Sequence, residues 1–270
     1  MKDPSYKLIT SDLDSTLITD TLILPEVNAC AVTRARSAGC HFAICSGRST
    51  HSIKRYEELL GLMAENTYGI SFNGSVVYET LSRNKIRDIQ MSHDLVQELT
   101  AQIIDNGATP WVYSGDDIYI VDMNEWAHEY SRRINTNFHV LESFRHFEGE
   151  ASKIIVPDHN TNLKRLEAHF IHKTDTRFNS FFSADFLYEF TAQYATKGEA
   201  LLFLADYLGV PVQQTIAIGD NLNDVHMVKV AGLGVAVKNA KPELKTLAAY
   251  ITERDCGQGA VAEVIDKFVL

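Results

Sequence analysis

Ser11-Asp12-Leu13-Asp14-Ser15-Thr16 follows the short apolar run Tyr6-Lys7-Leu8-Ile9-Thr10 near the N-terminus. A run of this kind predicts a buried strand of a parallel sheet, because such strands are covered on both faces. Asp12 and Asp14 then stand at the carboxyl end of the strand, which is the edge where open α/β sheets bind ligands. Since two neighbouring acids repel one another, the pair indicates a bound hard divalent cation.

Two other interpretations of this Asp-x-Asp motif compete with a catalytic site. A solvated turn is the commoner explanation for so short a motif. A calcium-binding loop needs a third ligand and a glycine next, and a glutamate at its twelfth position. Here Thr16 and Leu17 follow the acids and Ile23 stands at the twelfth position, so the calcium loop is excluded. The rest of the chain must decide between a turn and a catalytic site.

The composition is that of an ordinary globular protein, with 270 residues of which 45% are hydrophobic and 22% charged. The formal net charge of −10 argues against nucleic acid or an anionic membrane as the main partner. The four cysteines lack C-x-x-C spacing, the N-terminus lacks an apolar targeting core, and no apolar run reaches membrane-spanning length. We therefore expect a cytoplasmic protein with reduced cysteines, either a monomer or a homodimer.

Alternating helix and strand patterns predict an α/β fold in two parts. The first part ends in a hairpin whose turn is Asn73-Gly74, and the polar stretch 80–85 resembles a linker. Further strands and helices over 84–190 predict a separate inserted α/β unit, after which the first pattern resumes. We expect a Rossmann-like parallel-sheet core formed by residues 1–83 and 191–270, with an α/β cap domain at 84–190.

Individual elements follow from the periodicity of apolar residues and from Gly and Pro positions. In the core we expect strands at 40–45, 69–72, 75–78, 215–218 and 234–237. We expect core helices at 25–38, 50–60 and 242–249, one that follows Thr196-Lys197-Gly198 and runs to about Leu208, and one between Asp224 and Gly234. In the insert we expect helices at 94–105, 125–134 and 163–171, and strands at 111–113, 118–121, 153–156, 177–182 and 186–190.

Polar clusters stand at strand ends or helix starts along the core pattern: Asp12 with Asp14, Ser46-Gly47, Lys197, and Asp220 with Asn223 and Asp224. A phosphoryl-transfer site needs a nucleophile, a metal, a further positive charge and hydrogen-bond donors for the phosphate oxygens. Ser46 and the backbone at Gly47 can donate, Lys197 is a positive charge, and Asp220 is a third hard oxygen ligand. Each cluster alone is typical of a cap, a loop or a turn, but the four in this order favour phosphoryl transfer.

The motifs that carry a family resemblance are Asp12-Leu13-Asp14-Ser15-Thr16-Leu17, Cys45-Ser46-Gly47-Arg48, Phe72-Asn73-Gly74, Lys197, Gly219-Asp220-Asn221-Leu222-Asn223-Asp224 and the stretch 231–240. With them the chain resembles, nearly from end to end, the haloacid dehalogenase superfamily of phosphohydrolases. The resemblance is to its Cof-like branch, which carries a large α/β cap between the second and third motifs (type IIB). Three departures from the family pattern are Ser15 and Lys238 in place of glycines, and Gln258-Gly259 without a preceding acid. None of them removes a catalytic group.

The resemblance implies a role for each motif residue. Asp12 would attack phosphorus and form an aspartyl-phosphate, and Asp14 would act first as general acid and then as general base. Mg²⁺ would be held by the side chains of Asp12 and Asp220 and by the backbone carbonyl of Asp14. The implied phosphate-binding residues are Leu13 and Gly47 through their backbone N–H groups, and Ser46, Lys197 and Asn223. Asp224 would support the metal or Lys197, and Arg48 and Asn73 would contact the substrate or support the site.

The implied function is a Mg²⁺-dependent phosphatase of small phosphorylated metabolites, of the sugar phosphate, pyridoxal phosphate or FMN class, with the cap selecting the substrate. An acid at Asp14 points to hydrolysis, or to a phosphomutase, which usually has a smaller helical cap. A non-catalytic protein that binds phosphorylated metabolites is the other alternative. The cap aromatics are expected to form its core rather than a substrate platform: Trp111, Tyr113, Tyr119, Phe178, Phe181, Phe182, Phe186 and Tyr188.

Overall fold

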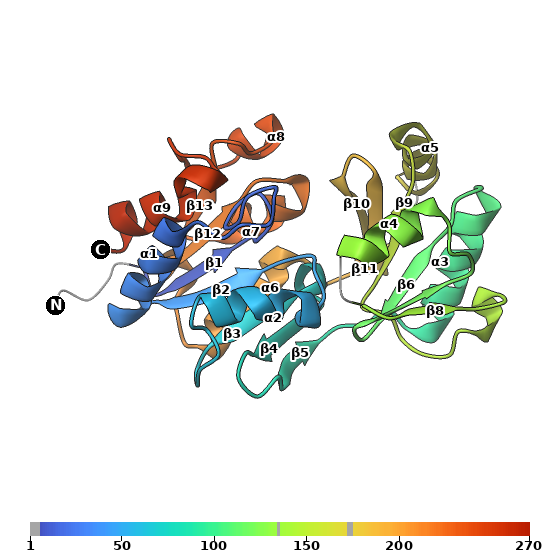
Figure 1. Cartoon of the computed structure of the whole chain (residues 1–270), viewed down its shortest axis with the longest axis horizontal. Coiled ribbons are helices and arrows are strands. Elements are labelled where there is room, and N and C mark those ends of the chain that lie inside the picture. The colour runs from blue at the N-terminus through green and yellow to red at the C-terminus, as the bar shows by residue number, and fades with distance from the viewer. Residues whose placement is uncertain (1–5, 134–135, 172–174) are drawn as a thin grey trace. The chain divides into compact units, whose positions relative to one another are not determined.

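The computed structural model describes residues 6–133, 136–171 and 175–270. The chain divides into two compact units, one formed by Met1–Asp88 with Thr196–Leu270 and the other by Ile89–Ala195. Figure 1 shows the first unit, here called the core unit, in blue, cyan, orange and red, and the second, here called the inserted unit, mostly in greens. The chain enters and leaves the inserted unit once each, so the core unit is made of two separate segments.

The core unit is built on an eight-stranded sheet in the order β14-β13-β12-β1-β2-β3-β4-β5. Its strands are β1 Leu8–Ser11, β2 His41–Cys45, β3 Tyr68–Ser71, β4 Val76–Glu79, β5 Lys85–Asp88, β12 Thr215–Gly219, β13 Leu233–Ala236 and β14 Tyr250–Ile251. All pairs from β14 to β3 are parallel, whereas β4 and β5 are added antiparallel. The predicted α/β fold with a parallel-sheet core is confirmed.

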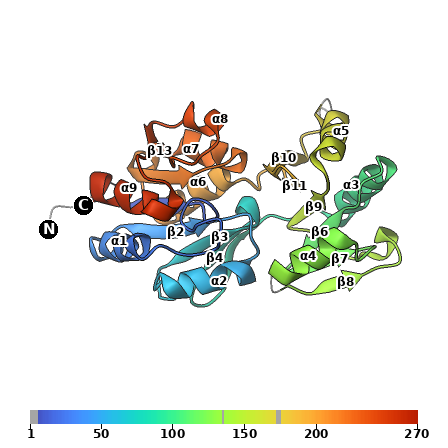
Figure 2. The ribbon, with the colours of Figure 1, turned by 45° about the horizontal axis from the view of Figure 1, so that its top comes forward.

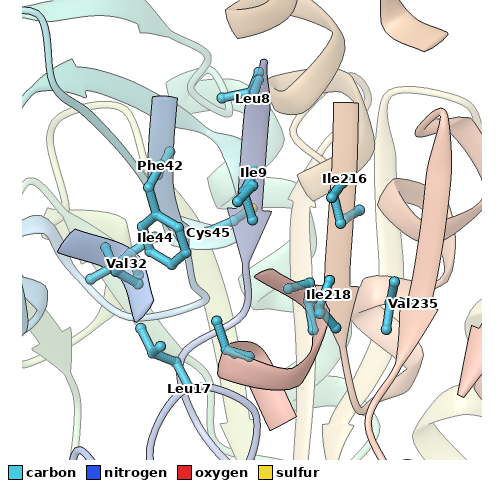
Figure 3. Packing of buried hydrophobic residues seen from close by; sticks show 14 of the residues in the cluster. Leu8, Ile9, Leu17, Val32, Phe42, Ile44, Cys45, Ile216, Ile218 and Val235 are labelled. Atoms are coloured by element: carbon cyan, nitrogen blue, oxygen red, sulfur yellow. The ribbon is translucent and has the colours of Figure 1, made fainter. Parts of the chain in front are cut away.

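Apolar side chains of the central strands form the core of this unit. The helices around the sheet are α1 Glu26–Ser37, α2 Thr50–Leu59, α6 Lys197–Tyr207, α7 Val225–Val230, α8 Pro242–Lys245 and α9 Ala260–Phe268. Figure 3 shows Ile9 of β1 between Ile44 of β2 and Ile216 of β12, all of them buried. Helices α1 and α9 pack against each other, as Figure 2 shows, and α6 packs against α7. Because β1 is covered on both faces and flanked on both sides, the loop that follows it starts from a fixed position.

The inserted unit has its own six-stranded sheet in the order β10-β11-β9-β6-β7-β8. Its elements are α3 His93–Asp105, β6 Trp111–Ser114, β7 Asp117–Ile120, α4 Glu125–Arg133, β8 Phe138–Val140, β9 Lys153–Pro157, α5 Asn160–Phe170, β10 Phe178–Ala184 and β11 Leu187–Ala192. Most of its aromatics are buried or half-buried, whereas Phe186 is exposed. Among the described residues, none of the helices combines the length and the apolar character needed to span a membrane.

Several expected elements differ in the structure. The stretch 80–85 is not a linker: β5 pairs with β4, and the inserted unit begins after Asp88 rather than at residue 84 and ends before Thr196 rather than at residue 190. The helix expected at 242–249 ends at Lys245, since the chain must reach β14 at Tyr250. Residue 134, the expected end of the helix at 125–134, lies outside the described residues. No element was expected where β8, β14 and α9 lie.

The sequence of α9 has apolar residues at helical spacing, Val261, Val264 and Ile265, a pattern that favours a helix. All three side chains are buried. We predict that Ile265→Ala lowers the free energy of unfolding by about 2–5 kcal/mol, since a buried side chain is truncated to leave a cavity. Leu59→Ala on α2, where Leu59 is 55% exposed, is the matched control and should change it by less than about 0.5 kcal/mol. Urea unfolding measures both, and equal effects would mean that α9 does not pack on the sheet.

Candidate active site

The loops after β1 and β12 and the start of α6 bring three charged side chains together at the carboxyl edge of the core sheet. Lys197 is the first residue of α6, and its Nζ atom lies 2.5 Å from Asp12 Oδ1 and 2.6 Å from Asp224 Oδ1. The side chains of Lys197 and Asp224 are fully buried, and that of Asp12 is 8% exposed. Asp224 Oδ2 also accepts hydrogen bonds from the backbone N–H groups of Asp220 and Asn221, at 2.9 and 3.0 Å. Asp224 therefore fixes both Lys197 and the loop after β12.

Asp220 adds a third carboxylate to this group. It follows β12 directly, and its Oδ1 accepts a hydrogen bond of 3.0 Å from Thr16 Oγ1 in the loop after β1. Ligand oxygens of Asp12, Asp220 and Asp224 all lie within 4.8 Å of one another. Three carboxylates face one ammonium group, so the cluster has an excess of negative charge. Carboxylate oxygens are the donors that hard cations such as Mg²⁺ prefer, and the residues present therefore fit such an ion.

The pKa values of these groups follow from burial and mutual repulsion. Burial raises the pKa of Asp220 to about 9, and the carboxylates of Asp12 and Asp224 add to this shift. Burial also raises the pKa of Asp12, to about 7, against the opposing effect of Lys197. Burial disfavours the charge of Lys197 as well, but Asp12 and Asp224 outweigh it and raise the pKa of the ammonium group. In the metal-free protein the cluster therefore holds protons that a bound cation would displace.

Asp14 makes an ion pair that the sequence did not predict. Its carboxylate accepts two hydrogen bonds from Arg48, one of 2.8 Å from Nε and a shorter one from Nη2. The guanidinium of Arg48 also lies over the ring of Tyr56, 5.6 Å from its centroid. Asp14 is half-exposed, unlike Asp12. The two acids of the first motif thus have different surroundings, one buried beside Lys197 and the other at the surface beside Arg48.

The remaining predicted phosphate-binding residues follow the carboxyl ends of β1, β2 and β12. Ser46 follows β2 and is buried, and its Oγ accepts a hydrogen bond of 3.1 Å from the backbone N–H of Arg48. Asn223 donates through Nδ2 to Asn73 Oδ1 at 3.0 Å. An added Cβ at Gly47 would lie 2.9 Å from the same oxygen of Asn73. Leu13 buries its side chain in the core, so only its backbone can serve the site.

Two side chains at the site had been given no role from the sequence. Thr16 was part of the quoted motif, but its bond to Asp220 joins residues 204 positions apart and has no local signal. His226 Nδ1 lies 2.7 Å from Oγ1 of Thr196, the residue whose side chain caps α6 by accepting from the N–H of Glu199. His226 therefore supports the start of the helix that carries Lys197.

The departures from the family pattern have structural consequences of different size. Ser15 adopts φ = 57°, the left-handed conformation that glycine accepts without strain, and its Oγ donates to Asp20 at 2.5 Å. Lys238 is exposed, whereas the backbone N–H of Lys241 donates to the carbonyl of Asp220 at 2.8 Å. The hydrogen bond to Asp20 therefore holds Ser15 in the conformation that glycine would adopt there, and the exposed Lys238 has no side-chain hydrogen bond to Asp220 among those described.

Comparison with known proteins places this geometry in a family. The family model for haloacid dehalogenase-like hydrolases matches residues 9–265. The Bacillus subtilis protein named "Putative phosphatase YxeH" is 29% identical, over 98% of this chain and 99% of its own length. A second B. subtilis relative, named 5-amino-6-(5-phospho-D-ribitylamino)uracil phosphatase YcsE, is 26% identical over 100% of this chain and 98% of its own.

Solved structures agree with the sequence relatives. A haloacid dehalogenase-like hydrolase from Bacteroides thetaiotaomicron superposes with a TM-score of 0.84 at 25% identity, covering 97% of this chain and 99% of that one. Both units of the fold are therefore shared, including the inserted one. The chain belongs to the haloacid dehalogenase-like hydrolase family, and the relatives that it matches from end to end are named as phosphatases.

Proposed function

We propose that this protein is a Mg²⁺-dependent phosphatase that removes phosphate from small phosphorylated metabolites through an aspartyl-phosphate on Asp12. The observation that carries the proposal is the buried cluster in which Lys197 bridges Asp12 and Asp224 beside Asp220. A purely structural ion pair would not need a third carboxylate whose charge burial disfavours. A dianionic phosphate ester, in contrast, requires excess positive charge around the attacking group, which Lys197 and a bound cation together would supply.

In the first proposed step an Asp12 carboxylate oxygen attacks phosphorus while the bond from phosphorus to the ester oxygen breaks. The leaving oxygen takes the electron pair and a proton from Asp14. Lys197 holds the carboxylate of Asp12 in place and offsets negative charge on the phosphoryl oxygens. Ser46, Asn223 and the backbone N–H groups of Leu13 and Gly47 would donate to those oxygens. In the second step water attacks phosphorus, Asp14 accepts its proton, and Asp12 is released.

The cation would be held by Asp12 and Asp220, with the backbone carbonyl of Asp14 as a further ligand. When bound it would neutralise negative charge shared by the nucleophile and the phosphate. Thr16 orients Asp220 by its 3.0 Å hydrogen bond, and Asp224 holds the backbone of the same loop. These contacts hold Asp220 in position even when no ion is bound.

The ion pair with Arg48 bears on the role of Asp14. In the structure this pair holds the Asp14 carboxylate against Arg48. In the proposed first step Asp14 must instead reach the leaving oxygen, so the acid role requires that Asp14 separates from Arg48 when substrate binds. The guanidinium of Arg48 would then suit contact with a substrate phosphate or hydroxyl.

We also propose that the inserted unit selects the substrate. The phosphate-handling residues all come from the core unit, so the rest of the substrate must be recognised elsewhere. The relative named for a ribitylaminouracil phosphate supports a small phosphorylated metabolite as the substrate. A phosphomutase would use the same core residues, but the large inserted sheet favours the hydrolytic branch of the family.

Hydrolysis of a panel of phosphorylated metabolites tests the proposal. With Mg²⁺ the protein should release phosphate from at least one member, and excess EDTA should abolish release. Asp12→Asn should lower turnover by several orders of magnitude, because it removes the attacking charge and a metal ligand. Asp20→Asn, in the exposed part of the same loop, is the control. Undiminished turnover in EDTA, or more than a few per cent of activity in Asp12→Asn, would contradict the proposal.

The raised pKa of Asp220 predicts a pH-dependent stability in EDTA. Between about pH 4 and pH 9 the folded protein keeps a proton on Asp220 that the unfolded chain has lost, so the stability contributed by Asp220 falls as pH rises through this window. Asp220→Asn cannot ionise, and its stability relative to wild type should rise from pH 6 to pH 8 by up to about 1.4 kcal/mol per pH unit. Urea unfolding measures the difference, which saturating Mg²⁺ should reduce. A difference independent of pH would show that Asp220 is already ionised.

The proposed acid role of Asp14 predicts that its loss depends on the leaving group. A sugar alkoxide needs a proton to leave, whereas p-nitrophenolate leaves as the anion. In Asp14→Asn, single-turnover release of alcohol from a sugar phosphate should fall by about 10²–10⁴-fold. Release of p-nitrophenol from its phosphate should fall much less. Single turnover is needed because the second step, in which Asp14 is the base, is the same for both substrates. Equal losses would show that Asp14 is not the leaving-group acid.

A further inference from the structure

The turn after β3 has an unusual backbone and is buried. Phe72, Asn73 and Gly74 have φ angles of 50°, 56° and 99°, three left-handed residues in a row. Asparagine and glycine accept this conformation at low cost, but for phenylalanine it is strained. Phe72 and Asn73 are only 2% and 1% exposed. Since strain of this kind persists only where surrounding contacts impose it, the contacts of the turn are informative.

Those contacts reach three of the motif segments at the site. The backbone N–H of Asn73 donates to the carbonyl of Ser46 at 3.0 Å, and that of Phe72 to the carbonyl of Arg48 at 2.9 Å. An added Cβ at Gly74 would lie 2.2 Å from the carbonyl oxygen of Thr196, the residue that caps the helix carrying Lys197. The Asn73 side chain accepts from Asn223. The turn therefore contacts segments from β2, α6 and the loop after β12, which are far apart in sequence.

The Asn73 amide makes the most specific of these contacts. Its Oδ1 accepts a hydrogen bond from one of the two N–H groups on Asn223 Nδ2. This bond fixes the rotation of the Asn223 amide, and it therefore also sets the direction of the second N–H group. The same Oδ1 lies 2.9 Å from the position that a Cβ would take at Gly47. A side chain at residue 47 would thus push Asn73 away from Asn223. Two elements of the proposed phosphate site, Gly47 and Asn223, meet at this one amide.

We infer that Asn73 is a positioning residue, which orients the Asn223 amide toward phosphate and seats the Ser46-Gly47 segment beside it. The inference rests on the proposed function, because it takes Asn223 as a phosphate ligand. Asn73 itself need not touch the substrate. Asn-Gly suits the turn between β3 and β4 by itself, but the turn does not require the hydrogen bond that Asn73 Oδ1 accepts from Asn223.

The test is a double-mutant cycle read out by binding of inorganic phosphate. Asn73→Gly removes the amide and accepts the left-handed backbone, so the turn keeps its conformation. Isothermal titration calorimetry with inorganic phosphate in the presence of Mg²⁺ gives Kd without turnover. We expect Asn73→Gly to weaken phosphate binding about three- to tenfold, the range that the net loss of one hydrogen bond between neutral groups gives. In the Asn223→Ala background the same change should have little effect, because the group that Asn73 orients is gone.

Ser75→Ala is the matched control. Ser75 Oγ donates to the carbonyl of Phe72 at 3.0 Å, so this variant loses a buried hydrogen bond of the same turn and keeps the Asn73 amide. It should lower the thermal unfolding midpoint and leave phosphate affinity unchanged. Equal losses of affinity in Ser75→Ala and Asn73→Gly would mean that general loosening of the turn is responsible.

Three outcomes would overturn the inference. They are unchanged phosphate affinity in Asn73→Gly, additive effects of Asn73→Gly and Asn223→Ala, and unchanged affinity in Asn223→Ala. None of these requires turnover. A wild-type protein that binds phosphate but hydrolyses no phosphate ester would contradict the proposed function instead, so the two failures are distinguishable.

Discussion

The ammonium group of Lys197 lies 2.5 Å from Asp12 and 2.6 Å from Asp224, in a place that water hardly reaches. Breaking such a buried pair by removing one partner costs about 3–5 kcal/mol, because an unpaired buried charge is left behind. The geometry of the site therefore depends on three segments meeting at this point: the end of β1, the start of α6 and the loop after β12. The parallel pairing of β1 with β12 and β2 sets that meeting point, and Asp224 bonds the loop backbone as well as the lysine.

The same arrangement places three carboxylates beside one ammonium group, so the site has two negative charges in excess when all the acids are ionised. Asp220 adds a third carboxylate within 4.8 Å of the other two, and burial raises its pKa to about 9. A protein that used Lys197 only to hold its loops together would be more stable without that acid. Binding of a divalent cation together with a phosphate would remove the repulsion among the three carboxylates. The cation would neutralise the acids, and the phosphate would then face Lys197.

Much of the fold followed from short-range patterns, because buried parallel strands and glycine-terminated helices are local features. Asp12 and Asp220 each follow an apolar run in the sequence, which predicted that both stand at the carboxyl edge of the sheet. In the structure they directly follow β1 and β12. Side-chain partners were harder to predict. The bonds from Thr16 to Asp220 and from Asn223 to Asn73 join residues 204 and 150 positions apart, and only the packed sheet brings them together. The stretch 80–85 was misassigned because the polar turn that joins β4 to β5 and a linker have similar composition.

The covalent step can be observed directly in Asp14→Asn with p-nitrophenyl phosphate as substrate. The first step needs no acid with this leaving group, whereas hydrolysis of the phosphoenzyme lacks its base. A phosphoryl group should then accumulate on Asp12, and acid quenching followed by peptide mass spectrometry should find it there in nearly stoichiometric amount, with a matching burst of p-nitrophenol. Slow steady release of p-nitrophenol with no burst and no phosphorylated peptide would show that water, and not Asp12, attacks phosphorus.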